Sequence, residues 1–157
     1  MLINFFVSQG VVHKEFVPEG KGVNAEFYKR GLDRLLKCVQ RICPAAFCSR
    51  HFFLYDNAPA HKAASVHQFL TQKSATILYH PPYRPDLSPP DYFLFPKLKM
   101  KLKEGLHFAD FAKIQEAITD KLKKVQKDKF SAAFQKLYNR TKAYIYAKGA
   151  YFKLKKR

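Results

Sequence analysis

Five prolines fall between residues 81 and 90, in the stretch HPPYRPDLSPPDYF. Proline donates no backbone N–H, and its ring clashes with the preceding helical turn, so neither a helix nor a regular strand is expected at this density. We therefore predict an ordered loop or linker over residues 81–92. It divides the chain into residues 1–80, with a sheet and helices, and residues 93–157, which read as helical and basic.

Strand and helix patterns alternate before the proline stretch, and helices gather after it. The predicted strands span residues 1–7, 11–17, 51–55 and 75–79, the first two joined as a hairpin by a turn at residues 8–10. The predicted helices span residues 23–43, 60–72, a segment that starts at Asp91, 111–125 and 130–147. KLKMKLK also alternates like a strand, but leucines at i+4 spacing favour a helix. The fold class is therefore α/β, with extra C-terminal helices.

The excess of basic residues indicates which class of molecule this protein binds. Lys and Arg number 29 against 12 Asp and Glu, a net charge of +17 with a pI near 9.9. Such a field attracts polyanions, and nucleic acid is favoured over an anionic membrane, since no lipidation motif or basic amphipathic anchor is evident. No apolar run is long enough to cross a membrane, and the apolar start reads as a strand and not as a signal peptide.

Three cysteines, Cys38, Cys43 and Cys48, occur without a CxxC pair. Free thiols are the favoured interpretation, and a metal cluster of Cys43, Cys48 and His51 stays open as the alternative.

Two aspartates stand where a metal site is expected. Asp56 ends a predicted strand, where α/β proteins place ligand-binding groups, and Asp91 follows after 34 intervening residues. Mg²⁺ takes carboxylate oxygens and keeps waters for substrate phosphates. From spacing alone, each aspartate is better explained as the cap of the helix that follows it.

The blocks YDNAPAH and HPPYRPDLSPPDYFLFPKL resemble the catalytic domain of mariner-type transposases of the Tc1/mariner superfamily. The resemblance continues upstream through VVHKEFVPEGKGVNAEFY and downstream to GAYFKLKK, so it covers the whole chain. It implies a ribonuclease H-like fold and DNA cleavage and strand transfer that depend on Mg²⁺ or Mn²⁺. Asp56 and Asp91 match the family's second and third catalytic, metal-binding carboxylates. The motifs depart from the family at Tyr55, where His is usual, and at Arg84, where Ser is usual.

The resemblance also assigns roles to neighbouring residues. Asn57 and His61 match positions expected to shape the site. The loop from Tyr83 to Leu87 resembles a segment that joins two transposase subunits, which makes a homodimer a candidate assembly. The subunit-contact residues are Tyr83, Pro85, Asp86 and Leu87.

The family's first catalytic Asp and its DNA-recognition helices match nothing in this sequence. We therefore expect a ribonuclease H-like core lacking its first strand, which leaves two sheet fragments with unpaired edges unless these close up directly. Asp33 and Asp86 are the candidate substitutes for the missing ligand, although Asp33 reads as a solvated helix residue and Asp86 as a turn cap. We expect this chain alone to be inactive. An incomplete reading of a longer active enzyme, and a host protein that reuses the fold for DNA binding or dimerisation, are the alternatives.

Any DNA binding is expected to be non-specific and dependent on salt, since no sequence-reading element is evident. The candidate phosphate contacts, just after Asp91, are Lys97, Lys99, Lys101 and Lys103. The family and the charge imply the nucleus, and the tail KLKKR is too short to decide.

Overall fold

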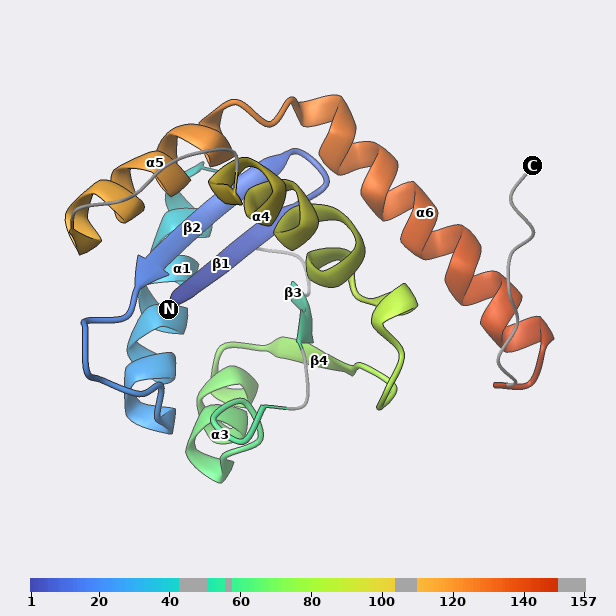
Figure 1. The fold of residues 1–157 in the computed structure, drawn as a ribbon. Coiled ribbons are helices and arrows are strands. Elements are labelled where there is room, and N and C mark those ends of the chain that lie inside the picture. The colour runs from blue at the N-terminus through green and yellow to red at the C-terminus, as the bar shows by residue number, and fades with distance from the viewer. Residues whose placement is uncertain (43–50, 56–57, 104–109, 150–157) are drawn as a thin grey trace. The chain divides into compact units, whose positions relative to one another are not determined.

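The computed structural model describes residues 1–42, 51–55, 58–103 and 110–149, with backbone only at residues 51 and 101–103. It divides into two compact units, Met1–Pro82 and Tyr83–Arg157. Figure 1 shows that the strands belong to the first unit, whereas the second is built from helices. No helix within the described ranges is long and apolar enough to cross a membrane.

The four strands assigned in the first unit form two separate two-stranded sheets. β1 (Leu2–Val7) and β2 (Gly10–Phe16) make the predicted antiparallel hairpin. β3 (His51–Tyr55) and β4 (Ala75–Tyr79) pair in parallel, with Tyr55 opposite Tyr79. The expectation of two sheet fragments is confirmed for these strands, and direct closure of one fragment on the other does not occur between them.

Both sheets pack on one hydrophobic core supplied by α1 (Ala25–Ile42) and α3 (Ala64–Gln72). The core residues of the two helices are Tyr28, Leu32, Leu35, Val66 and Leu70. Side chains from both sheets pack against them, among them Ile3, Phe5, Val12, Phe53 and Ile77. The apolar periodicity that predicted the two helices is therefore the periodicity of their buried faces.

The ends of these helices follow local chemistry. α1 starts at Ala25, close to the predicted start at residue 23, because the Asn24 side-chain oxygen accepts a hydrogen bond from the Phe27 amide at 2.8 Å and caps the helix. The predicted start of the second helix at residue 60 is wrong by four residues. The Ala58 carbonyl accepts hydrogen bonds from the amides of His61 and Lys62, which closes a separate turn, and Ala63 is then extended with ψ 137°.

In the second unit, the prediction that the proline stretch, residues 81–92, holds no helix is wrong. It contains a 3-10 turn η1 (Pro85–Leu87) and a π-helical turn η2 (Pro90–Leu94), which leads into α4 (Phe95–Lys103). Pro85 and Pro90 stand at the first positions of their turns, where the missing N–H has no partner to lose. The helical interpretation of KLKMKLK is confirmed by α4, and α5 (Phe111–Lys123) and α6 (Lys127–Tyr146) follow.

Candidate functional site

The first candidate carboxylate, Asp56, follows β3 directly in the sequence. Asp56 and Asn57 lie outside the described residues, so their predicted roles stay predictions. The described end of β3 is Tyr55, whose hydroxyl is buried without a hydrogen-bond partner in the described part of the chain. Burial, with a smaller contribution from Tyr79, raises the pKa of the Tyr55 phenol.

His61 is held close to this strand end by aromatic rings. Its ring centroid lies 4.0 Å from that of Tyr28 on α1 and 5.3 Å from that of Tyr55, which it meets edge-on. These contacts restrain the imidazole beside the last described residue of β3. The predicted site-shaping role of His61 is not itself tested by this placement.

The second candidate carboxylate, Asp91, is exposed in the first turn of η2. Its backbone N–H donates to the Ser88 carbonyl at 3.0 Å. Within the described residues, its carboxylate makes no hydrogen bond or ion pair. A carboxylate held in place through its backbone, with its oxygens in solvent, is available as a ligand for a hard cation.

The three residues after Asp91 fix the position of that turn. The Tyr92 hydroxyl donates to the Ala133 carbonyl on α6 at 2.8 Å, and burial raises the pKa of Tyr92 to about 12. The Phe93 ring meets the Phe130 ring edge-on at 5.2 Å, and Leu94 is 1% exposed. Since these side chains point into the helical unit, Asp91 is left on its surface.

The two candidate substitute ligands are both engaged elsewhere. Lys37 Nζ lies 2.7 Å from Asp33 Oδ2, and a hydrogen bond from that lysine lowers the pKa of Asp33. Arg84 donates from Nε and Nη2 to the two carboxylate oxygens of Asp86, at 3.0 and 2.9 Å, and lowers the pKa of Asp86. No group of three or more His, Cys, Asp or Glu side chains able to hold a metal occurs among the residues described.

The proline loop is tied to α6 by two arginines. Besides its fork to Asp86, Arg84 stacks its guanidinium on the Tyr144 ring at 4.5 Å and is 8% exposed. Arg140 donates from Nη1 to the Asp86 carbonyl at 2.6 Å and lies 4.5 Å from the Tyr92 ring centroid. Sequence reasoning missed both Arg140 and Tyr144, because only the folded helix brings them to a loop more than fifty residues earlier.

The predicted subunit-contact residues therefore divide in two. Tyr83, 97% exposed and at a positive φ of 58°, and the exposed Pro85 remain accessible. Leu87 is buried, and Asp86 is bound to Arg84.

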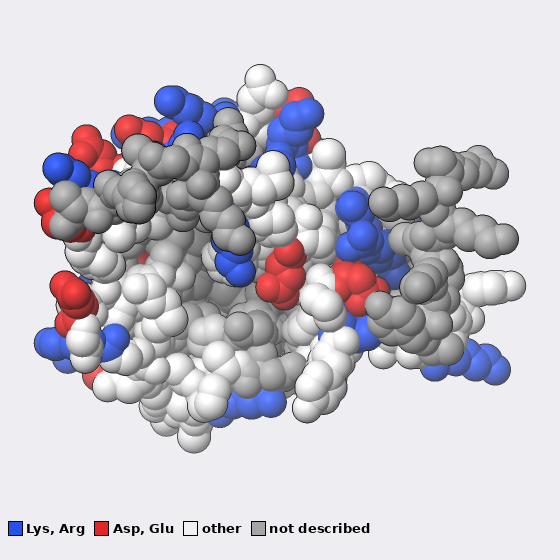
Figure 2. Space-filling model, in the orientation of Figure 1, with Lys and Arg blue, Asp and Glu red and all other residues white. Residues whose placement is uncertain are grey.

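The four predicted DNA-binding lysines lie on α4 but not on one face of it. A residue advances about 100° around an α-helix, so positions 97 and 101 fall on one side of the buried Leu98 and positions 99 and 103 on the other. Lys97 and Lys99 are exposed, and Lys97 Nζ lies 4.5 Å from the Phe93 ring centroid. The side chains of Lys101 and Lys103 are outside the described part. Figure 2 shows that basic side chains, in blue, and acidic side chains, in red, both lie on the drawn face.

Residues 12–116 match the family described as DDE superfamily endonuclease. The chain is 36% identical to the mariner Mos1 transposase of Drosophila mauritiana over 106 residues, which are 66% of this chain and 31% of that protein. It is 27% identical to the human histone-lysine N-methyltransferase SETMAR over 154 residues, 97% of this chain and 22% of that one. The chain thus spans less than a third of the length of these curated relatives.

Solved structures of Mos1 transposase match almost the whole chain. The structure of its catalytic domain with raltegravir and Mg superposes with a TM-score of 0.88 at 29% identity, and the match covers 97% of this chain and 76% of that one. Its paired-end complex with the left transposon end matches with a TM-score of 0.84 at 28% identity, over 97% of this chain and 44% of that one. The α/β fold class is therefore that of the Mos1 catalytic domain.

Proposed function

The chain belongs to the family of DDE superfamily endonucleases, and from this we propose that it supplies a DNA-holding surface and two metal-binding carboxylates of a mariner-type transposase catalytic domain. The chemistry of that domain is DNA cleavage and strand transfer. The observation that carries the proposal is Asp91, whose carboxylate is exposed and unpaired among the described residues on a turn anchored by Tyr92, Phe93 and Leu94.

Asp56 and Asp91 are the residues proposed to hold Mg²⁺ or Mn²⁺. The donor set fits a hard cation, because both groups are carboxylates and the candidate substitutes, Asp33 and Asp86, are paired with basic side chains. The structure of the Mos1 catalytic domain with raltegravir and Mg supports the choice of ion. When bound, the metal supplies an activated water and stabilises the departing 3′ oxygen. Asn57 and His61 are proposed to orient the groups around the ligands.

A direct metal titration tests this assignment. We expect Mn²⁺ binding, measured by electron paramagnetic resonance of the free ion, to weaken roughly tenfold or more in both Asp91→Asn and Asp56→Asn, since each substitution removes one anionic ligand. Asp33→Asn is the matched control, because that carboxylate is paired with Lys37 on α1. Equal Mn²⁺ affinity in the Asp91→Asn and Asp33→Asn chains contradicts the assignment.

Cleavage is a separate question from metal binding. These 157 residues contain two of the three carboxylates that the resemblance requires, so we propose that by themselves they bind metal and DNA without turnover. The assay is nicking of supercoiled plasmid with Mg²⁺ or Mn²⁺ present. Nicking by this chain that disappears in Asp56→Ala would show that the two carboxylates suffice.

DNA contact is proposed for the lysines of α4, with the phosphate backbone as the ligand. Each phosphate contact contributes about 0.9 to the slope of log K against log salt concentration, so Lys97→Gln with Lys99→Gln should flatten that slope by about 2. Lys37→Gln is the control, because Lys37 is paired with Asp33. Fluorescence anisotropy with a labelled random duplex across a salt series measures both slopes, and equal changes in the two variants refute the lysine assignment.

A binding module without catalysis is the second candidate. It is favoured by the match of 97% of this chain within SETMAR, a protein named for histone methylation. In that case DNA binding persists in the double variant Asp56→Asn, Asp91→Asn and needs no divalent ion.

We also propose nuclear residence, which imaging of a tagged chain in cells would test. Self-association through Tyr83 and Pro85 is proposed too, and light scattering of Tyr83→Ser against the parent chain would test it.

A further inference from the structure

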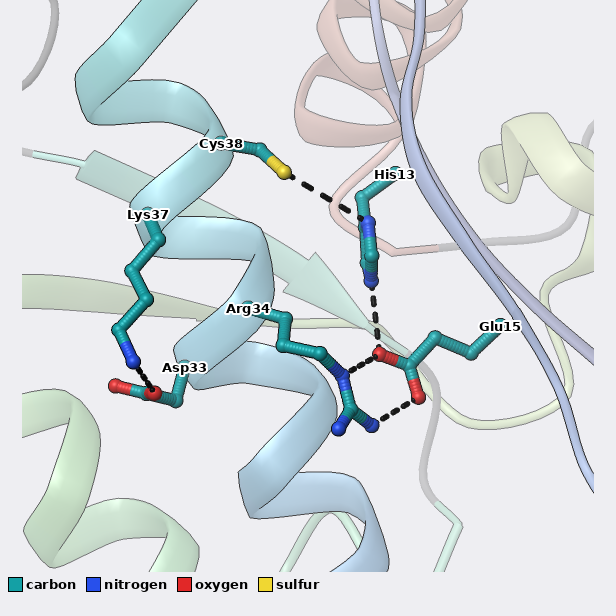
Figure 3. A network of polar contacts seen from close by, with 6 residues as sticks. All are labelled: His13, Glu15, Asp33, Arg34, Lys37 and Cys38. Carbon is teal, nitrogen blue, oxygen red and sulfur yellow. Dashed lines mark hydrogen bonds and ion pairs between the residues drawn. The ribbon is translucent and has the colours of Figure 1, made fainter.

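A second polar cluster lies within the first unit, on the face of β2 toward α1 (Figure 3). His13 and Glu15 occupy alternate positions of β2 and so face the same side of the hairpin. Arg34 and Cys38 lie one turn apart on α1. The cluster contains a nucleophile, a base and a carboxylate in a row, and none of these groups is used by the proposed DNA chemistry.

The distances define a chain of polar contacts. Arg34 binds Glu15 through both Nε and Nη2, each at 2.5 Å from a different carboxylate oxygen. Glu15 Oε1 lies 2.8 Å from His13 Nε2. Cys38 Sγ lies 3.9 Å from His13 Nδ1, at the opposite side of the ring. Figure 3 shows the imidazole standing between the thiol and the carboxylate.

The ionised carboxylate fixes which nitrogen of the ring donates to it. The hydrogen bonds from Arg34 lower the pKa of Glu15, whose side chain is 8% exposed, so the carboxylate is ionised and can only accept. His13 must therefore donate from Nε2. In the neutral ring, the lone pair then sits on Nδ1, and this is the nitrogen that faces Cys38.

We propose that Cys38 is an oxidation site for hydroperoxides, with His13 as the base that takes the thiol proton and with Glu15 and Arg34 orienting that base. The S–H proton passes to His13 Nδ1, and the sulfur electron pair attacks one peroxide oxygen. An S–O bond forms and the O–O bond breaks. The sulfur is oxidised to a sulfenic acid and both peroxide oxygens are reduced; the leaving oxygen takes the proton from His13 and departs as water, or as an alcohol from an organic hydroperoxide.

The surroundings of the thiol allow this chemistry. Cys38 is a free cysteine and is half-buried, so the residue keeps part of its surface in solvent. Phe5 on β1 stacks on the His13 ring at 6.2 Å and limits its rotation. The charged or titratable groups on the elements around the cluster are His13, Lys14 and Glu15 on β2, Glu26, Tyr28, Lys29, Arg30, Asp33, Arg34, Lys37, Cys38 and Arg41 on α1, His67 on α3 and Lys73 at its end. Asp33 is paired with Lys37, which leaves Glu15 as the acceptor for His13.

The test uses the full chain with Cys43→Ser and Cys48→Ser, so that Cys38 is the remaining thiol. The protein is treated with hydrogen peroxide, the sulfenic acid is trapped with dimedone, and the adduct is followed by intact mass. At about pH 7, we expect folded Cys38 to react roughly tenfold faster than the same chain unfolded in urea, because only the folded chain places His13 Nδ1 beside the thiol to take its proton. Equal rates in the folded and unfolded chains overturn the proposal, and this comparison needs no further variant.

The role of His13 has its own readout. His13→Gln should slow the reaction roughly tenfold at about pH 7 and leave it nearly unchanged at about pH 9.5, where the solvent removes the thiol proton. A merely structural role would change the rate equally at both pH values, and that result overturns the assignment of the base. Glu15→Gln removes the negative charge that pairs with Arg34. It should slow the reaction at about pH 7, but by less than His13→Gln does. Asp33→Asn, on the same helix but outside the row, should leave both rates unchanged.

Discussion

Replacing Arg84 with Ala tests whether the contacts of this residue stabilise the proline loop, residues 81–92. Arg84 is 8% exposed and makes two charge-assisted hydrogen bonds to Asp86, at 3.0 and 2.9 Å. Such bonds contribute about 1 kcal/mol each where the acceptor keeps partial access to water, as the 34% exposed Asp86 side chain does. The stacked contact with Tyr144 adds about 0.5–1 kcal/mol. We therefore expect Arg84→Ala to lower the free energy of unfolding by about 2–3 kcal/mol.

The assay is equilibrium urea denaturation followed by far-UV circular dichroism near neutral pH. Lys37→Ala is the matched control, because it breaks an exposed pair with Asp33 on a helix surface and should cost about 0.5 kcal/mol or less. Arg84→Lys keeps the charge but loses the planar fork. It should therefore lower the free energy of unfolding by more than Lys37→Ala and by less than Arg84→Ala. If Arg84→Ala costs no more than Lys37→Ala, the loop is not held by this contact and the argument for its role fails.

Two further predictions concern titration. Hydrogen bonding from Arg84 lowers the pKa of Asp86 below its ordinary value of 3.8, so its stabilisation is present above that value and is lost as the pH falls through the lowered pKa. The stability difference between the parent and Arg84→Ala chains should therefore shrink at the acid end to the part contributed by the contact with Tyr144. Tyr92, whose pKa is raised to about 12, binds its proton more tightly in the folded state, so stability falls as pH rises between about 10 and 12. Absorbance titration at the tyrosinate band should lose this late component in Tyr92→Phe, a variant that also loses about 1 kcal/mol of stability with its hydrogen bond to Ala133. A late component that persists in Tyr92→Phe contradicts the assignment.

Local patterns were sufficient for most elements of this fold. The strands His51–Tyr55 and Ala75–Tyr79 have the boundaries expected from their β-forming residues, and the first helix starts close to the predicted residue 23, just after its Asn24 cap. The predicted start of α3 was wrong because the hydrogen bonds of a turn after Ala58 compete with helix formation. The spacing of apolar residues carries no information about these hydrogen bonds. The helical turns at Pro85 and Pro90 were missed because proline disrupts a helix interior but is compatible with its first position.

The sequence by itself determined the family, the basic charge and the two aspartates proposed as ligands, since motifs and spacing are properties of the chain read in order. Tertiary structure decided which acidic groups are available. Asp86 is bound by Arg84, Asp33 by Lys37 and Glu15 by Arg34, whereas Asp91 is exposed because its neighbours are buried. It also placed Cys38 beside His13, twenty-five residues away. These outcomes depend on contacts between residues far apart in the chain, and such contacts exist only after the helices and strands have packed.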